Sequence, residues 1–378
     1  MFLAIRDIRF AKGRFALMGG VVALITLLLV MLSGLTAGLG NQSTSSIEKL
    51  GTGDGSGTAV SQVVFGAPGK NEAKASFTES EVTQAQLDAW AKQPGVASAV
   101  PLGITQTRFQ GADAAAPGTK TGTTNVAVFG VGASSGPSQL SPSPVTDGTV
   151  VIGQGVAKDL SLSVGDAVTM GGTEVKVSAI VPDQWYSHTS VVWTTLPTWT
   201  KLAHLSDPAQ IATVVAVTFD GGATVDTAGA NAAAGTISTS RTGAYAGLGG
   251  YSSEHGSLLM MQAFLYGISA LVIVAFLTVW TVQRTRDIAV LKAMGASSGY
   301  LLKDALTQAA IVLAAGAAVG GLVGVVGGFF AAQAAPFLVT PATTLLPIIG
   351  IVALGLAGAA LAVRNVTKVD PLIALGGN

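Results

Sequence analysis

Two long uncharged stretches, separated by a short charged segment, constrain the fold of this chain more than any other feature. Residues 258–282 and 305–334 contain no Asp, Glu, Lys or Arg. About 20 consecutive apolar residues are enough for a helix to cross the hydrocarbon core of a bilayer, so we predict a transmembrane helix in each stretch. The chain contains 49% hydrophobic and only 11% charged residues, which is typical of a membrane protein and not of a soluble domain.

The second of these stretches carries a glycine at every fourth position, at Gly316, Gly320, Gly324 and Gly328. Residues four apart lie on one side of a helix, and glycine leaves that side without side chains. Small residues at this spacing let two helix backbones approach closely inside a membrane. We therefore predict that this side of the helix packs against another helix and does not face lipid.

Two further uncharged stretches, residues 15–39 and 344–363, bring the number of predicted spans to four. Basic residues are concentrated in the N-terminal segment 1–14, in the loop 283–304 and in the tail 364–378. Because loops rich in Lys and Arg stay in the cytoplasm, we expect these three segments and both termini inside the cell. The first stretch is longer than the apolar region of a cleaved signal peptide, so we expect an uncleaved first span.

Residues 41–256 form a polar insert between the first and second spans, and the predicted topology places this insert outside the membrane. Short β-rich runs at residues 96–100, 126–131 and 150–152 predict strands. Residues 168–170 and 174–180 flank a Gly-Gly pair and predict a β-hairpin. The predicted fold is thus four transmembrane α-helices with a large α+β extracytoplasmic domain inserted between helices 1 and 2.

Other local features of the insert concern a helix and a group of aromatic residues. Residues 82–92 predict a helix, for which Thr78 or Ser80 is a suitable N-cap. We interpret Trp185, Tyr186, Trp193 and Trp199 first as core residues, because aromatic side chains bury large areas. His188 lies among them and is interpreted as an ordinary domain residue.

The charged loop 283–304 has an amphipathic pattern. Ile288, Leu291 and Met294 are three residues apart, and basic residues occupy other positions. This spacing predicts a short helix at the membrane surface, although a plain interhelical loop is the alternative. Gly295 can end such a helix in a left-handed conformation, and Ser297 or Ser298 can cap the next one.

Two separate segments resemble a known family. The run RTRDIAVLKAMGASSGYLLKDALTQAAI and the run TVVIGQGVAKDLSLSVGDAVTMGGTEVKVSAIV resemble the MacB and FtsX-like permeases of ATP-binding-cassette systems. The resemblance implies that two copies pair in the membrane and that each binds an ABC ATP-binding subunit. It also implies that the cytoplasmic loop contacts this ATPase, through the candidate coupling residues Arg286, Ile288, Leu291, Lys292, Met294 and Gly295.

The N-terminal runs LAIRDIRFAKGRF and MLSGLTAGLGNQ are similar to HrtB-type permeases, which implies an HrtA-type ATPase partner and haem as the transported substrate. Soft and anionic side chains occur where the predicted spans meet the outer boundary, and such groups ligate haem iron or hydrogen-bond its edge. Ordinary membrane methionines and interfacial polar residues are the alternative interpretation. The candidate substrate-binding residues are Met31, Glu48, Tyr251, Glu254, His255, Met260 and Met261.

Several function classes find no support in the sequence. It contains no GxxxxGK[ST] motif and no cysteine, and its three histidines lack metal-motif spacing. We therefore expect a non-enzymatic membrane subunit with no intrinsic cofactor and no structural metal. Equal numbers of basic and acidic residues, 20 of each, give no electrostatic reason to expect nucleic-acid binding.

The expected function is that of a permease in the cytoplasmic membrane of a bacterium, which couples ATP hydrolysis by its partner to expulsion of a hydrophobic substrate. An FtsX-like transmitter that activates a cell-wall hydrolase is one alternative. Export of a lipid, peptide or antibiotic by the same mechanism is another. The long insert 41–256 and the short loop between the third and fourth spans favour the MacB-like alternatives.

Overall fold

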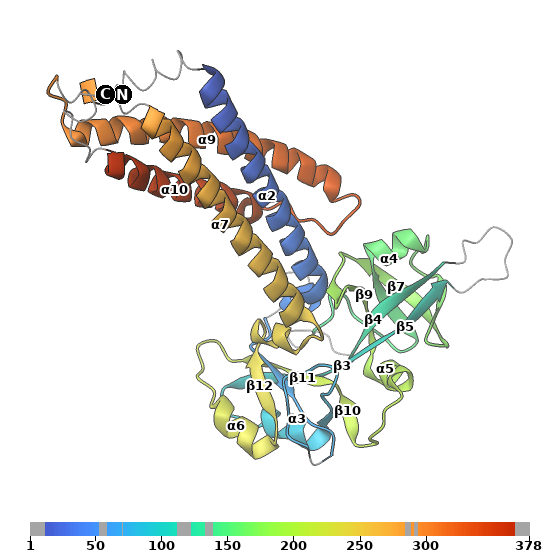
Figure 1. The fold of residues 1–378 in the computed structure, drawn as a ribbon. Helices are drawn as coiled ribbons and strands as arrows, with labels where there is room; N and C mark the ends of the chain where they lie inside the picture. Colours follow the sequence, from blue (N-terminus) through green and yellow to red (C-terminus); the bar gives the residue numbers. More distant parts are fainter. Residues whose placement is uncertain are drawn as a thin grey trace. The chain divides into compact units, whose positions relative to one another are not determined.

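The computed structural model describes residues 12–52, 59–69, 71–111, 122–132, 139–283, 289–290 and 294–366. The chain forms two compact units (Figure 1). The helical unit contains Met1–Leu39 and His255–Asn378, and the sheet unit contains Gly40–Glu254.

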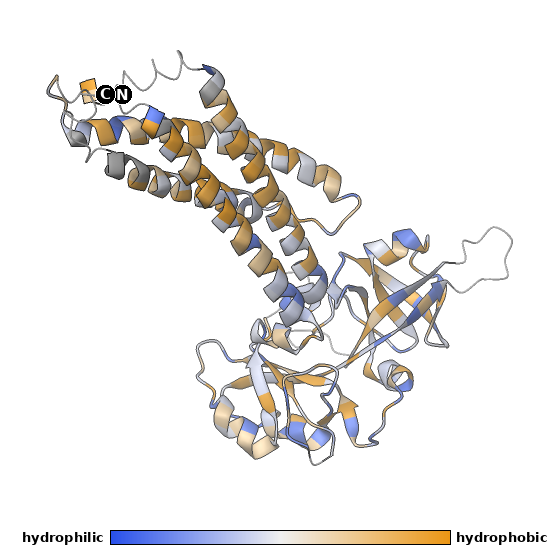
Figure 2. Ribbon diagram, viewed as in Figure 1, coloured by the Kyte–Doolittle hydropathy of each residue, from blue (hydrophilic) through white to orange (hydrophobic). Residues whose placement is uncertain are grey.

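Long apolar helices make up the helical unit. They are α2 (Lys12–Glu48), α7 (Tyr251–Gln283), α9 (Ser298–Ala331) and α10 (Pro341–Val366), of which α2 ends and α7 begins in the sheet unit. Four helices of the described chain are long and apolar enough to cross a membrane, and Figure 2 shows hydrophobic residues along all of them. The predicted fold class, four membrane helices with a large α+β domain after the first, is confirmed.

The four helices share one hydrophobic core. Leu29 from α2, Ile273 from α7, Leu313 from α9 and Ile351 from α10 are all buried in it. Most remaining apolar side chains of these helices are exposed, as expected where the solvent is hydrocarbon and not water. The core therefore determines which side of each helix faces its neighbours.

The glycine-rich side of α9 packs closely against α2. A Cβ atom at Gly320 would overlap the backbone carbonyl of Ala23, and one at Gly316 would lie 2.7 Å from the carbonyl oxygen of Gly19. At Gly324 the same atom would lie 2.9 Å from Val30 Cγ1. The prediction that these glycines pack against another helix is confirmed for Gly316, Gly320 and Gly324, whereas a Cβ atom at Gly328 would meet the Phe337 ring in the segment between α9 and α10.

The sheet unit contains a ten-stranded sheet, a two-stranded sheet and several short helices. Its strands are β1 (Gln62–Phe65), β2 (Val82–Thr83), β3 (Val96–Gly111), β4 (Thr123–Val131), β5 (Thr149–Gly153), β6 (Ala167–Met170), β7 (Thr173–Val181), β8 (Trp185–Tyr186), β9 (Thr189–Thr195), β10 (Gln210–Ala212), β11 (Val214–Phe219) and β12 (Ile237–Ser240). Its helices are α3 (Gln84–Ala91), α4 (Gln154–Asp159), α5 (Leu196–Ala203), α6 (Thr227–Ala234) and the 3₁₀ helix η1 (Gly243–Gly247).

The long strand β3 belongs to two substructures. Its first half extends the antiparallel order β12-β1-β11-β3, and α3 and α6 bury Trp90 and Ala230 against this part of the sheet. Its second half closes a ring in the order β3-β4-β9-β5-β7-β6, because β6 pairs back onto β3. All six strands of the ring contribute side chains to one core, so the ring is a small closed barrel.

Of two local predictions for the sheet unit, the β-hairpin is confirmed and the helix cap is wrong. Strands β6 and β7 form the predicted antiparallel hairpin, with Gly171 and Gly172 both at positive φ, 55° and 85°. Thr83, and not Thr78 or Ser80, caps α3 through a capping box with Gln86. The helix begins later than predicted because Val82 and Thr83 form β2, and pairing with β10 keeps them extended.

Candidate functional site

The predicted substrate residues fall on both units. Within the helical unit, Met31 is half-buried on α2, and its sulfur would lie 3.6 Å from a Cβ atom added at Gly327 of α9. Met260 and Met261 of α7 are 62% and 51% exposed, and His255 is half-buried one turn after the start of α7. The two α7 thioethers are thus available to a ligand or a second chain, whereas Met31 is partly covered by α9.

Within the sheet unit, Glu48 and Tyr251 belong to a cluster that also contains Tyr245 and Arg241. The rings of Tyr245 and Tyr251 are in edge-to-face contact, with centroids 5.9 Å apart. Burial raises the pKa of Tyr245 above its usual value, the charges of Glu48 and Tyr251 raise it further, and the charge of Arg241 opposes them. The Tyr245 phenol therefore stays neutral and remains a hydrogen-bond donor at physiological pH.

The turn between β8 and β9 binds the end of α2. The backbone N–H groups of Ser187 and His188 donate to the carbonyl oxygens of Ser43 and Gln42 at 3.1 and 2.9 Å. Ser187 and His188 both have left-handed backbones, with φ of 44° and 62°. This conformation is unfavourable for residues other than glycine, so the surrounding contacts must stabilise it.

The His188 ring joins the ends of two helices. Its Nε2 lies 3.1 Å from Ser43 Oγ of α2 and 2.9 Å from Glu254 Oε2 in the first turn of α7. The Nε2 proton can be donated to the carboxylate, which is the stronger, charge-assisted acceptor. Glu254, predicted as a substrate residue, is thus already occupied by His188.

His188→Ala is expected to lower the melting temperature of the full-length protein by about 2–4 °C, because about 1 kcal/mol of hydrogen bonding is lost from a domain of this size. Circular dichroism during heating measures this. His204→Ala is the matched control, since His204 is also exposed and left-handed, with φ of 47°, at the end of α5, but its side chain makes no hydrogen bond to the described residues. Equal melting temperatures for the two variants would contradict a stabilising role of the His188 contacts.

The predicted ATPase-coupling segment is described only in part. Arg286, Ile288, Leu291 and Lys292 lie outside the described residues. Met294 is 70% exposed, and Gly295 has the predicted left-handed backbone, with φ of 97°. Ser297 caps α9 by accepting a hydrogen bond from the Tyr300 backbone N–H at 3.2 Å, as predicted.

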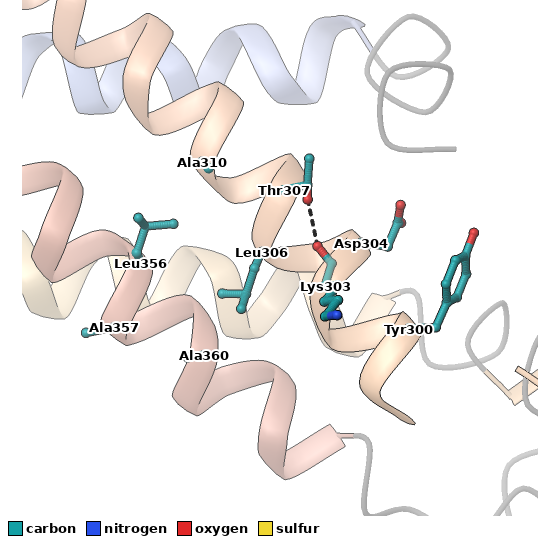
Figure 3. A pocket seen from close by; sticks show the side chains of 9 residues that line it. All are labelled: Tyr300, Lys303, Asp304, Leu306, Thr307, Ala310, Leu356, Ala357 and Ala360. Carbon is teal, nitrogen blue, oxygen red and sulfur yellow. Dashed lines mark hydrogen bonds between the residues drawn. The ribbon is translucent and has the colours of Figure 1, made fainter. Parts of the chain in front are cut away.

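A groove of about 850 Å³ follows this segment, between the first turns of α9 and the last turns of α10 (Figure 3). Tyr300, Lys303 and Asp304 form its polar part, and Leu306 and Leu356 belong to its apolar part. Asp304 Oδ2 accepts a hydrogen bond from Gln308 at 2.8 Å, whereas Asp304 Oδ1 is enclosed with no hydrogen-bond partner among the described residues. The segment predicted to contact the ATPase therefore continues into a surface with charged and aromatic side chains.

Arg241, Tyr245 and the contacts of His188 were not predicted from the sequence. Arg241 and Tyr245 are in the Gly- and Ser-rich connector before α7, which has no periodic pattern. The partners of His188 are 145 and 66 residues away in the chain. The part of the chain that the structure describes holds no group of three or more His, Cys, Asp or Glu side chains suited to a metal ion.

Two protein families match the chain. Residues 15–234 match the family described as the MacB-like periplasmic core domain, and residues 259–371 match the FtsX-like permease C-terminal family. The two matches follow the order of the fold, since the first contains most of α2 and nearly all of the sheet unit. The second contains most of α7 and all of α9 and α10.

Individual relatives include two groups of bacterial permeases. A Staphylococcus haemolyticus protein whose name describes it as a hemin transport system permease, HrtB, is 30% identical over 218 residues, which cover 57% of this chain. The match spans 60% of the length of that relative. An uncharacterized ABC transporter permease of Mycobacterium bovis is 25% identical over 100% of this chain and 99% of its own length.

Solved structures of isolated domains also match. The periplasmic region of MacB from Actinobacillus actinomycetemcomitans is 12% identical, with a TM-score of 0.34, and the match covers 52% of this chain and 92% of that one. The extracellular domain of the ABC-type transporter YknZ from Gram-positive bacteria is 16% identical, with a TM-score of 0.32, and the match covers 47% of this chain and 97% of that one.

Proposed function

Because the chain belongs to the MacB/FtsX-type family of ABC transporter permeases, we propose that it is the membrane subunit of an efflux system driven by a separate ATPase. Among the described residues, four helices are long and apolar enough to cross a membrane. The full sequence lacks a GxxxxGK[ST] motif, so the nucleotide is hydrolysed by an ABC ATP-binding subunit of the HrtA type. The termini and the loop 283–304 lie in the cytoplasm, and the sheet unit lies outside.

Haem is the substrate that we propose. The similarity to proteins named for hemin transport supports this assignment. The candidate residues include thioethers at Met31, Met260 and Met261 and a phenol at Tyr251, which are types that ligate haem iron. A flat porphyrin with two carboxylates needs both apolar and polar contacts, and these residues offer both.

In the proposed mechanism, two copies of the chain pair through their membrane helices, and each binds one ATPase. ATP-driven closure of the ATPase pair moves the loop 283–304 and the two helices joined to it, α7 and α9. The hydrogen bonds of His188 to the end of α2 and the start of α7 support the transfer of this movement into the sheet unit. The substrate held near the outer boundary is then expelled outward.

Haem titration of the purified permease with its ATPase partner tests the function and the predicted site. We expect haem to shift the Soret band and to increase ATP turnover. At least one single alanine variant of the candidate residues should bind haem about tenfold more weakly than the wild type, which corresponds to about 1.4 kcal/mol of binding free energy. The variants are Met31→Ala, Glu48→Ala, Tyr251→Ala, Glu254→Ala, His255→Ala, Met260→Ala and Met261→Ala.

Two results would contradict these proposals in different ways. If haem binds but no variant alters the spectrum or the affinity, the site assignment is wrong and the substrate assignment stands. If haem neither binds nor changes ATP turnover, the substrate is not haem. In that case an exported lipid, peptide or antibiotic, or an FtsX-like transmitter role, becomes the better explanation of the same fold.

A further inference from the structure

Arg241 has an enclosed guanidinium nitrogen without a partner. Its Nη1 atom is buried and has no hydrogen-bond partner among the described residues. Across the same residues the ion pairs are Lys74–Glu79 and His188–Glu254, and neither involves Arg241. An enclosed charged donor without an acceptor is unfavourable by more than a typical hydrogen bond contributes. Its position therefore favours an oxyanion that comes from outside the described chain.

The neighbours of Arg241 suit an oxyanion attached to an aromatic molecule. Arg241 is close enough to Tyr245 to influence it electrostatically, and so are Glu48 and Tyr251. The neutral Tyr245 phenol is a hydrogen-bond donor, and the edge-to-face pair with Tyr251 presents aromatic surface beside the cation. Glu48 is the acidic residue of this cluster, but it is exposed and forms no ion pair with Arg241 among the described residues, so its carboxylate is not a direct partner of the guanidinium.

We propose that Arg241, with the phenol of Tyr245, forms an oxyanion subsite that binds one carboxylate of the exported substrate. This inference rests on the proposed function, since haem carries two carboxylates on an otherwise apolar ring. A guanidinium can donate two parallel hydrogen bonds to a carboxylate, which lysine or glutamine cannot do. The subsite thus selects an amphipathic substrate with an ionised carboxylate, separately from any group that ligates its iron.

The test compares haem with haem dimethyl ester, in which both carboxylates are blocked. Both compounds are titrated into the full-length permease in phosphatidylcholine nanodiscs, and binding is followed by the Soret band. We expect the wild type to bind haem at least about tenfold more tightly than the ester, as expected for a charge-assisted hydrogen bond. Arg241→Gln should remove this difference by weakening haem binding alone.

Two control variants separate the subsite from general damage. Arg108→Gln removes an exposed arginine from β3 of the same unit and should keep the preference for haem over the ester. Arg241→Lys keeps the positive charge but cannot donate two parallel hydrogen bonds, so it should retain only part of the preference for haem over the ester. Unchanged melting temperatures of both Arg241 variants would show that their folding is intact. If one of them unfolds, Tyr245→Phe replaces it. Tyr245→Phe should also reduce the preference for haem over the ester.

Three results would overturn the proposal. Equal affinity of the wild type for haem and the ester would remove the subsite and leave the haem assignment in place. A preference for haem that Arg241→Gln leaves unchanged would mean that a group other than Arg241 selects the carboxylate. Failure of both compounds to bind the wild type would remove the subsite together with the proposed substrate.

Discussion

Gly320→Leu is expected to destabilise the full-length protein by at least about 3 kcal/mol, the upper part of the range for overpacked interiors. A side chain at this position would occupy the place of the Ala23 backbone carbonyl, and a backbone atom cannot move aside as the end of a flexible side chain can. Helices α2 and α9 would separate and lose dispersion contacts along their shared side. Thermal unfolding of the purified protein in detergent measures the loss.

The matched control for this substitution is Gly299→Leu in the same helix. A Cβ atom at Gly299 would meet no atom within 4 Å. Both substitutions raise the intrinsic helix propensity by up to about 1 kcal/mol, so only the packing differs between them. Equal stability of the two variants would show that α9 does not pack against α2 through its glycine-rich side.

Replacing both Leu291 and Met294 by aspartate is expected to abolish export and to reduce copurification of the ATPase by more than about tenfold, because burying a carboxylate at an interface is strongly unfavourable. The Met294 side chain is 70% exposed, as a contact residue for a partner should be. Leu291 lies outside the described residues, and its inclusion rests on the spacing in the sequence. Affinity purification of the tagged permease measures the bound ATPase.

Ala293→Asp is the control for the aspartate pair. Ala293 lies outside the described residues, but the spacing in the sequence puts it on a different side of the predicted amphipathic helix from Leu291 and Met294. This variant should keep the ATPase and the export activity. Normal copurification and export in the double variant would remove the coupling role from this segment.

Local chemistry made much of the fold predictable. Long uncharged stretches indicate membrane helices because the bilayer leaves a backbone few other ways to satisfy its hydrogen bonds. Gly171 and Gly172 indicated a tight hairpin, Gly295 a left-handed helix end and Ser297 a cap, and the structure confirms all of them. Each of these features depends on residues that are close together in the sequence.

The sequence alone also determined the class of protein, the four membrane helices, the inserted α+β domain and the side of α9 that packs. Only the tertiary structure decided which distant groups meet. His188 contacts Ser43 and Glu254 across 145 and 66 residues, and the cluster around Arg241 and Tyr245 draws on the end of α2 and the start of α7. Such contacts depend on how distant segments come together in space. No short-range pattern encodes this, because hydropathy and propensity report only on the nearest neighbours along the chain.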